Sequence, residues 1–296
     1  MRVIISGGGT GGHIFPAIAI ANALKASDST IEILFVGAKG KMEMEKVPVA
    51  GYKIVGLPVA GFHRKLNIKN ILRNTLFPFK LLASMTKAGS VIRNFKPDVV
   101  VGVGGYASGP ILRRAAKKGI PCLIQEQNSY PGVTNKILAK DVRKICVAYP
   151  DMDRFFPSDK ILVTGNPVRQ SLLTYVDREE AASHFGLNPN LPIILVVGGS
   201  LGARSINEGL KESLDDLHED VQLLWQTGKF YYSSVKEELD AKKKPNVVAM
   251  DFIKRMDYAY ALADIVISRA GASSISELAL LGKASILVPS PNVSED

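Results

Sequence analysis

The chain has 296 residues, of which 46% are hydrophobic and 22% are charged, a composition that excludes a disordered protein. This length is enough for two domains of ordinary size. The net charge is +9, from 37 basic and 28 acidic residues. Residues 61–96 contain eight basic residues and no acidic one, so the rest of the chain is nearly neutral. This uneven placement argues against a general nucleic-acid-binding protein and favours a local anionic partner.

The cysteines and the apolar runs predict a cytoplasmic location. Cys122 and Cys146 both lie in apolar runs without metal-ligand spacing, which is typical of buried free thiols rather than a disulfide. The first apolar run, residues 3–5, breaks at once into glycines, so we expect no signal peptide. No apolar stretch approaches the roughly 20 residues that a membrane-spanning helix needs.

Short apolar strands alternate with helical patterns in two successive blocks. In the first block we expect strands at residues 3–6, 31–36, 98–103, 122–125 and 144–148, and helices at 16–24 and 111–118. In the second we expect strands at 192–197, 221–225, 247–250, 265–268 and 285–288. This order predicts an α/β protein with two Rossmann-like, doubly wound parallel-sheet domains, residues 1–164 and 165–296, that face each other across a cleft. The turn Gly165-Asn166-Pro167 marks the expected boundary.

Three glycine-rich loops follow predicted strands, at residues 7–12, 102–110 and 198–204. The first has G-x-G-x-x-G at Gly7, Gly9 and Gly12, a pattern that lets backbone approach a pyrophosphate, although the glycines could serve only a tight turn. A dinucleotide site also needs a carboxylate at the tip of the second strand, and residues 36–40 contain none. No Lys-Ser/Thr pair follows the glycines, which excludes a P-loop. Three loops in two domains favour two phosphate-bearing ligands.

Six short motifs then carry a family resemblance. They are residues 8–16 (GGTGGHIFP), 104–110 (GGYASGP), 125–128 (QEQN), 165–169 (GNPVR), 198–200 (GGS) and 269–277 (RAGASSISE). Together they closely resemble the MurG family, peripheral glycosyltransferases of the GT-B fold that convert lipid I to lipid II. The resemblance implies inverting transfer of N-acetylglucosamine from UDP-GlcNAc to the 4-hydroxyl of the MurNAc of undecaprenyl-linked lipid I in peptidoglycan synthesis. It implies no cofactor and no metal.

The resemblance also implies a binding site for UDP-GlcNAc. Its residues are Thr10, Gly11, Gly12, Asn128, Arg169, Ser200, Ile253, Ala272 and Glu277. Glu277 would bind the ribose hydroxyls, Ser200 and Arg169 would contact the diphosphate, and the backbone of Ile253 would hold uracil.

Four of these residues also have a plainer interpretation. Glu277 could be a surface carboxylate in the first turn of a helix, where it complements the helix dipole. Asn128 could form only the turn before Ser129, Arg169 could be solvated, and Ile253 could be an ordinary core residue.

The acceptor side centres on His13, at the start of a helix after the first glycine loop. Inversion needs a base near the acceptor hydroxyl, and imidazole titrates in the right range, so His13 is the candidate general base. Positioning of the substrate, or helix capping and packing, are the alternatives. We expect the loop of Gly104, Gly105, Tyr106 and Ser108 to contact the acceptor or its phosphate.

The basic segment is the candidate membrane patch. Its key residues are Lys69, Arg73, Leu76, Phe77, Phe79 and Lys80. Apolar residues at helical spacing interleaved with cations fit a helix on an anionic leaflet, although a buried core helix is the alternative. The protein is therefore expected at the cytoplasmic face of the cell membrane, where proteins of cell-wall synthesis are possible partners.

Rival functions remain open. The chain has no DxD carboxylate pair at a strand end, which argues against metal-dependent transfer. A transferase for another lipid such as a diacylglycerol, and a UDP-GlcNAc 2-epimerase, would share the architecture, but an epimerase has no use for a membrane patch. The family continues beyond the position of residue 296, so we also consider a truncated binding module without activity.

Overall fold

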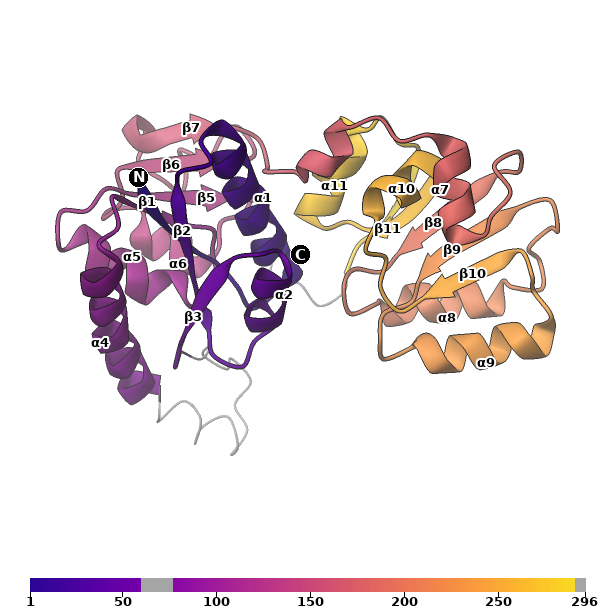
Figure 1. The fold of residues 1–296 in the computed structure, drawn as a ribbon, viewed down its shortest axis with the longest axis horizontal. Coiled ribbons are helices and arrows are strands. Elements are labelled where there is room, and N and C mark those ends of the chain that lie inside the picture. Colours follow the sequence, from indigo (N-terminus) through magenta and orange to yellow (C-terminus); the bar gives the residue numbers. More distant parts are fainter. Residues whose placement is uncertain (60–76, 291–296) are drawn as a thin grey trace. The chain divides into compact units, whose positions relative to one another are not determined.

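The computed structural model describes residues 1–59 and 77–290, which belong to two compact units, Met1–Val168 and Arg169–Asp296 (Figure 1). The boundary lies four residues beyond the predicted one, so the Gly165-Asn166-Pro167 turn stays with the first unit. Hydrogen bonds of Asn166 explain this difference. Its Oδ1 accepts from Gln125 Nε2 and its Nδ2 donates to the carbonyl of Gln127, both at 3.1 Å.

The first unit is a seven-stranded, fully parallel sheet in the order β3-β2-β1-β4-β5-β6-β7. The strands are β1 (Arg2–Ser6), β2 (Glu32–Ala38), β3 (Lys53–Leu57), β4 (Val99–Gly102), β5 (Cys122–Glu126), β6 (Lys144–Val147) and β7 (Ile161–Val163). The helices are α1 (Gly11–Ser27), α2 (Glu43–Val49), α4 (Phe77–Phe95), α5 (Ser108–Ala116) and α6 (Val133–Leu138), with a 3₁₀ turn at Ser158–Lys160.

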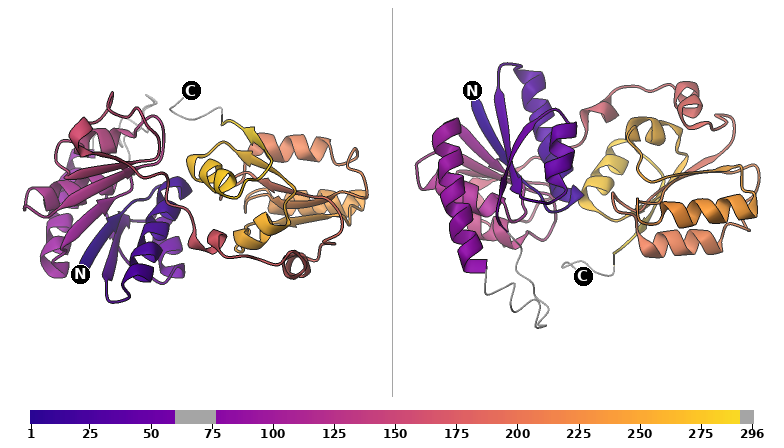
Figure 2. Two further views of the ribbon diagram at one scale, coloured as in Figure 1. Left: turned by 90° about the horizontal axis from the view of Figure 1, so that it is seen from above. Right: turned by 60° about the horizontal axis from the view of Figure 1, so that its bottom comes forward.

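Helices cover both faces of this sheet because alternate strand residues point to opposite sides (Figures 1 and 2). Val3 and Ile5 of β1 pack with α1 and α2, whereas Ile4 packs in the core that includes α4, α5 and α6. Strands buried on both faces are continuously apolar, as the sequence shows.

The second unit repeats this plan with five parallel strands in the order β10-β9-β8-β11-β12. The strands are β8 (Ile193–Val197), β9 (Gln222–Gln226), β10 (Val247–Met250), β11 (Ile265–Arg269) and β12 (Ser285–Val288). The helices are α7 (Arg178–Phe185), α8 (Arg204–Glu212), α9 (Tyr232–Lys242), α10 (Met256–Leu262) and α11 (Ala272–Leu280), with a 3₁₀ turn at Gln170–Leu173. One core lies beneath α8 and α9, and the other beneath α7, α10 and α11.

The structure confirms two α/β domains with doubly wound parallel sheets and every predicted strand, with ends shifted by a residue or a few. It adds β3 and β7, which the sequence analysis missed, and it begins α1 at Gly11 rather than at residue 16. Cys122 and Cys146 are free thiols, as predicted, but only Cys122 is buried and Cys146 is half-buried. Within the described ranges, no helix is both long and apolar enough to cross a bilayer.

Candidate functional site

The predicted glycine loops lie at topological switch points, where neighbouring strands continue into connections on opposite sides of the sheet; the first unit has two such loops and the second has one. In the first unit β1 and β4 are neighbours, and Ser6 pairs with Gly102 at their carboxyl ends. In the second unit β8 and β11 are neighbours, and Val197 pairs with Ser268. Ligands of doubly wound sheets bind at such points. The predicted loops therefore lie where this fold places its binding sites.

The two glycine loops of the first unit pack backbone on backbone. Gly104 (φ +94°) and Gly105 (φ +82°) both adopt left-handed conformations that favour glycine. A Cβ at Gly104 would lie 2.6 Å from Cδ2 of His13, and one at Gly105 would collide with the carbonyl of Gly8. Side chains at these positions would displace the first loop and the His13 ring. The glycines are therefore required by this contact and by their own φ angles.

Glu43, at the start of α2, is a functional candidate that the sequence analysis missed. Its side chain is buried, and its carboxylate accepts from Ala38 N at 2.8 Å and from Gly9 N at 3.0 Å. Residues 36–40 contain no carboxylate, as the sequence shows, but α2 brings the carboxylate of Glu43 to the backbone of Ala38 at the end of β2. Both of its oxygens bind backbone amides of this unit. The Gly9 amide, in the loop expected to approach a pyrophosphate, donates to Glu43.

His13 lies in the first turn of α1, partly buried beneath Gly104. Its Nδ1 is 3.2 Å from the hydroxyl of Thr10. Burial lowers the pKa of His13 below its ordinary value. Three smaller effects oppose this shift: the charge of Glu126, a hydrogen bond to the backbone of Gly8, and the charge of Glu43. The imidazole is therefore neutral near pH 7, the form that can accept a proton.

A second buried carboxylate, Glu126 at the end of β5, holds the loop that contains Asn128. Its Oε1 accepts from the backbone N of Asn128 at 3.1 Å and from Asn128 Nδ2 at 3.2 Å. Its Oε2 accepts from Gly132 N at 3.0 Å and Asn135 Nδ2 at 2.9 Å. Asn128 thus takes part in fixing its own turn, and its contact with the sugar remains a prediction.

The residues predicted for the acceptor loop differ in exposure. Ser108 is buried, and its hydroxyl is within donating distance of the carbonyls of Ser6 (2.9 Å) and Gly104 (2.7 Å). Tyr106 is exposed. Ser108 therefore fixes the end of β1 to the second loop, whereas Tyr106 is free to meet a ligand.

In the second unit, Glu277 is buried and holds two side chains. Its Oε1 accepts from Arg169 Nε at 2.8 Å, and its Oε2 accepts from the hydroxyl of Tyr260 at 3.1 Å. Glu277 is the sixth residue of α11, so the interpretation as a first-turn surface carboxylate is wrong. The interpretation of Arg169 as merely solvated is also wrong. Burial and the Glu277 carboxylate raise the pKa of Tyr260.

The loops that contain Ser200 and Ile253 are joined by one side chain, Gln226. Its Nε2 donates to the carbonyl of Gly199 at 3.0 Å, and its Oε1 accepts from Ile253 N at 2.8 Å. Gln226 is buried at the carboxyl end of β9, and the Ile253 side chain is also buried. No motif in the sequence marked Gln226, which ties Gly199 and Ile253 together.

Arg269, the last residue of β11, borders a hollow of about 440 Å³ beside the glycine loop of the second unit. Its Nη1 donates to the carbonyl of Pro289 at 2.6 Å and its Nη2 to the hydroxyl of Ser205 at 2.7 Å. Ser205 lies in the first turn of α8, whose N-terminus has no side-chain cap and no acidic residue. The N-terminus of α11, where Ala272 lies, has the same character. Uncapped N-termini suit an anion.

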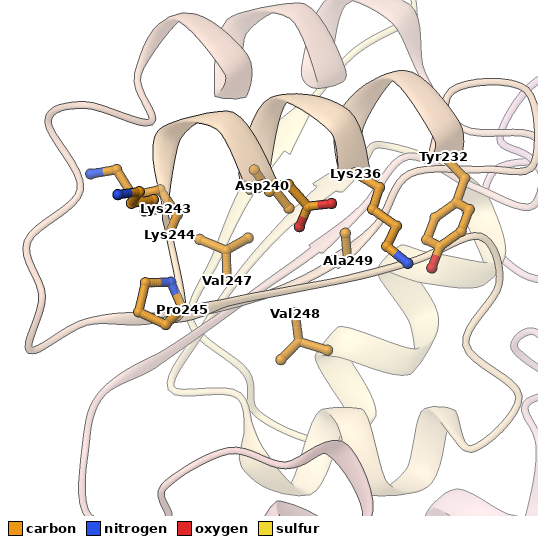
Figure 3. Close-up of a pocket in the computed structure, with 10 residues that line it drawn as sticks. Tyr232, Lys236, Asp240, Lys243, Lys244, Pro245, Val247, Val248 and Ala249 are labelled. Atoms are coloured by element: carbon orange, nitrogen blue, oxygen red, sulfur yellow. The ribbon is translucent and has the colours of Figure 1, made fainter.

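A second hollow in the second unit lies apart from the predicted ligand-binding residues. This hollow of about 590 Å³ between α9 and β10 is lined by three lysines, Asp240, Tyr232 and apolar residues, and it includes none of the predicted ligand-binding residues (Figure 3). In residues 1–59 and 77–290, no group of three or more His, Cys, Asp or Glu could hold a metal ion.

The candidate membrane patch is described only in part. Lys69, Arg73 and Leu76 lie outside the described residues. Phe79 and Lys80 are exposed in the first turn of α4, and Leu82 follows them on the surface. The later residues Val91 and Ile92 are buried. Of the predicted patch, the described residues Phe79 and Lys80 are exposed, so at these two positions the helix is not core; membrane binding itself stays a prediction.

Comparison with known proteins assigns both units. Residues 3–147 match the glycosyltransferase family 28 N-terminal domain, and residues 193–296 match the glycosyltransferase family 28 C-terminal domain. The chain belongs to glycosyltransferase family 28. This confirms the prediction, made from the six motifs, that the two sheets are the domains of a glycosyltransferase.

Relatives within the family are highly similar. The UDP-N-acetylglucosamine–N-acetylmuramyl-(pentapeptide) pyrophosphoryl-undecaprenol N-acetylglucosamine transferase of Parabacteroides distasonis is 61% identical over 297 aligned residues. The transferase of the same name from Bacteroides fragilis is 59% identical. The alignments cover all of this chain and 80% and 78% of those relatives.

Solved structures agree with this assignment. MurG of Acinetobacter baumannii is 30% identical, with a TM-score of 0.69 over 99% of this chain and 80% of that one. A UDP-GlcNAc 2-epimerase from Neisseria meningitidis bound to UDP-GlcNAc is 16% identical, with a TM-score of 0.64 over 97% of this chain and 82% of that one. The second likeness shows a shared fold alone.

The environment of His13 leads to a titration prediction. Because burial outweighs the nearby carboxylates, the imidazole should titrate below its ordinary value of 6.5. The unfolded chain then binds this proton more tightly than the folded chain does. The contribution of His13 to the free energy of unfolding is therefore fully present above pH 6.5 and is lost as the pH falls through the lowered pKa. NMR titration of the histidine side chains, with His13→Gln to assign the signal, measures this. A midpoint at or above 6.5 would show that burial does not dominate.

Proposed function

We propose that this chain transfers N-acetylglucosamine from UDP-GlcNAc to the MurNAc 4-hydroxyl of undecaprenyl-linked lipid I and so forms lipid II. The observation that carries this proposal is the 61% identity, over the whole chain, to a transferase named for this reaction. The rival epimerases are similar in fold at 13–16% identity, which supports no shared activity.

The second unit, residues 169–296, binds the donor in this proposal. Ser200 lies in the glycine loop, Ala272 begins α11, and both neighbouring helices, α8 and α11, have uncapped N-termini. Their amides can stabilise the negative charge that develops on the UDP leaving group without a metal. Ile253 is buried and its backbone N–H donates to Gln226 Oε1, so the uracil contact proposed for this residue falls to its backbone carbonyl.

Glu277 binds the ribose hydroxyls in this proposal. A carboxylate offers about four lone-pair positions, and Arg169 and Tyr260 occupy two of them. The remaining positions can accept from two hydroxyl groups. Arg169 both orients this carboxylate and carries a positive charge that can contact the diphosphate.

The first unit, residues 1–168, binds the acceptor. Neutral His13 accepts the proton of the attacking hydroxyl as the new C–O bond forms and the bond from the sugar to UDP breaks. Attack from the face opposite the leaving group inverts the anomeric carbon. Gly11 and Gly12, at the start of α1, and Thr10, beside the imidazole, lie next to this base. Tyr106 is the exposed member of the loop proposed to contact the acceptor.

The chain acts at the cytoplasmic face of the membrane, as a peripheral protein, because its acceptor is lipid-linked. The exposed residues Phe79, Lys80 and Leu82 of α4 support this location. Apolar side chains can enter a leaflet while cations meet anionic headgroups. Proteins of cell-wall synthesis at the same surface are possible partners within this proposal.

The reaction is tested by following labelled GlcNAc from UDP-GlcNAc to a short-chain analogue of lipid I. We expect a labelled disaccharide product, with turnover reduced about 10²–10⁴-fold in His13→Ala, the usual contribution of a general base. UDP affinity should be unchanged in that variant. A loss of less than tenfold would make His13 a positioning residue, and absence of product with the wild-type chain would contradict the proposed activity.

Two variants that both disturb Glu277 should differ in their effect on UDP affinity. Glu277→Ala should weaken UDP binding by about 1–3 kcal/mol, the range for lost charged hydrogen bonds. Tyr260→Phe removes one hydrogen bond to Glu277 but keeps the carboxylate, so it should lower stability by about 1 kcal/mol with little change in UDP affinity. Calorimetric titration with UDP and thermal unfolding measure both effects. Unchanged UDP affinity in folded Glu277→Ala would refute the assignment.

The surface of α4 predicts two components of membrane binding. Phe79 and Leu82 are 72% and 68% exposed, so replacing both with serine should leave the fold intact. This double variant should lose the salt-resistant fraction that sediments with anionic vesicles. Lys80 and Lys87 are both exposed on α4, and replacing both with glutamine should lose the salt-sensitive fraction, about 1 kcal/mol for each cation.

The matched control for this experiment lies in the second unit. Leu173 and Phe230 are 67% and 85% exposed, and replacing both with serine should not change sedimentation. If the Phe79/Leu82 variant sediments like the wild type at high salt, α4 is not the apolar contact.

A further inference from the structure

Strand β9 carries a buried glutamine at each end, Gln222 and Gln226. They are four residues apart and therefore point to the same face of the sheet. Gln222 Nε2 donates to the carbonyl of Asn188 at 2.7 Å, and its Oε1 accepts from Asn188 N at 2.8 Å. Gln222 thus binds both backbone groups of one residue at the amino end of the strand.

Gln226 uses the same two atoms in a different way at the carboxyl end. Its Nε2 donates to Gly199, which precedes Ser200, and its Oε1 accepts from Ile253. The orientation of this amide is unambiguous, because a carbonyl can only accept and a backbone N–H can only donate. With Gln226 buried, water cannot easily replace either bond.

We propose that Gln226 is a positioning residue for the donor, one that sets the spacing between the loop for the diphosphate and the backbone that meets the base. This inference rests on the proposed function, which assigns Ser200 to the diphosphate and Ile253 to uracil. A ligand with both a base and a diphosphate depends on that spacing, whereas a nucleoside needs only the base contact. Gln226 should therefore matter more for UDP than for uridine.

The variant Gln226→Glu separates the two bonds. A carboxylate still accepts from Ile253 N, but it has no hydrogen to donate and repels the carbonyl of Gly199. We expect UDP affinity to fall about tenfold or more relative to uridine affinity. At low pH the protonated carboxyl regains a donor, so the UDP-to-uridine ratio should recover towards the wild-type ratio at the same pH.

Gln222→Glu is the matched control, because it makes the same exchange on the same strand against the carbonyl of Asn188. Gln222→Glu should lower the melting temperature about as much as Gln226→Glu does, but it should leave the ratio of UDP affinity to uridine affinity unchanged. Calorimetric titrations of the folded variants measure the ratios. An unchanged ratio in Gln226→Glu, or an equal change in both variants, would overturn the inference and leave Gln226 a structural residue.

Hydrogen exchange of the wild-type chain tests the same coupling without a substitution. Uridine should slow exchange in residues 198–202 as well as around Ile253, because Gln226 connects them. Protection confined to the Ile253 segment would overturn the inference. Failure of the wild type to bind UDP at all would overturn the proposed donor site itself, which distinguishes the two cases.

Discussion

Direct packing of backbone on backbone is the constraint on which both candidate sites depend. In the first unit Gly105 lies against Gly8, and in the second Gly202 lies against the carbonyl of Thr227 while Gly228 lies against Leu201. Any other residue at Gly105, Gly202 or Gly228 would pay roughly 1–2 kcal/mol for its left-handed φ angle, before any collision of the Cβ. The amides and carbonyls of these loops are therefore placed by the strands that carry them.

Buried polar side chains then fix loops that glycine alone would leave free. Glu43, Gln226 and Glu277 each join groups from separate segments of the chain, and Glu126 joins groups within residues 128–135. Burying such groups is unfavourable unless they are hydrogen-bonded, and here the bonds are made. Removing one of them would leave its partners unsatisfied, which costs about 1–3 kcal/mol for each buried group. Their main effect is therefore to specify loop geometry.

The fold was predictable from the sequence because its strands are buried on both faces and read as continuous apolar runs. The glycine loops were equally visible, and their positions after strands placed them correctly. β3 was missed because Lys53 and Gly56 interrupt its apolar pattern, and β7 because it has only three residues. Glu43 and Gln226 could not be recognised, because the groups that they bind are distant in the sequence. Helix packing and strand order bring those groups close, and no local motif marks the contact. Glu277 was recognised from its motif, but its burial beside Tyr260 was not.

The contact of Glu43 with the first glycine loop also limits how this part of the protein can evolve. A Cβ at Gly8 would strike the Glu43 carboxylate, and a Cβ at Gly37 would lie 2.5 Å from its Cγ. A larger residue at either glycine displaces the Glu43 side chain, and a displaced or shorter side chain at position 43 leaves the Gly9 and Ala38 amides unsatisfied. No single substitution among these three positions is neutral. They are therefore expected to covary, as one inherited unit, among sequences that keep this arrangement.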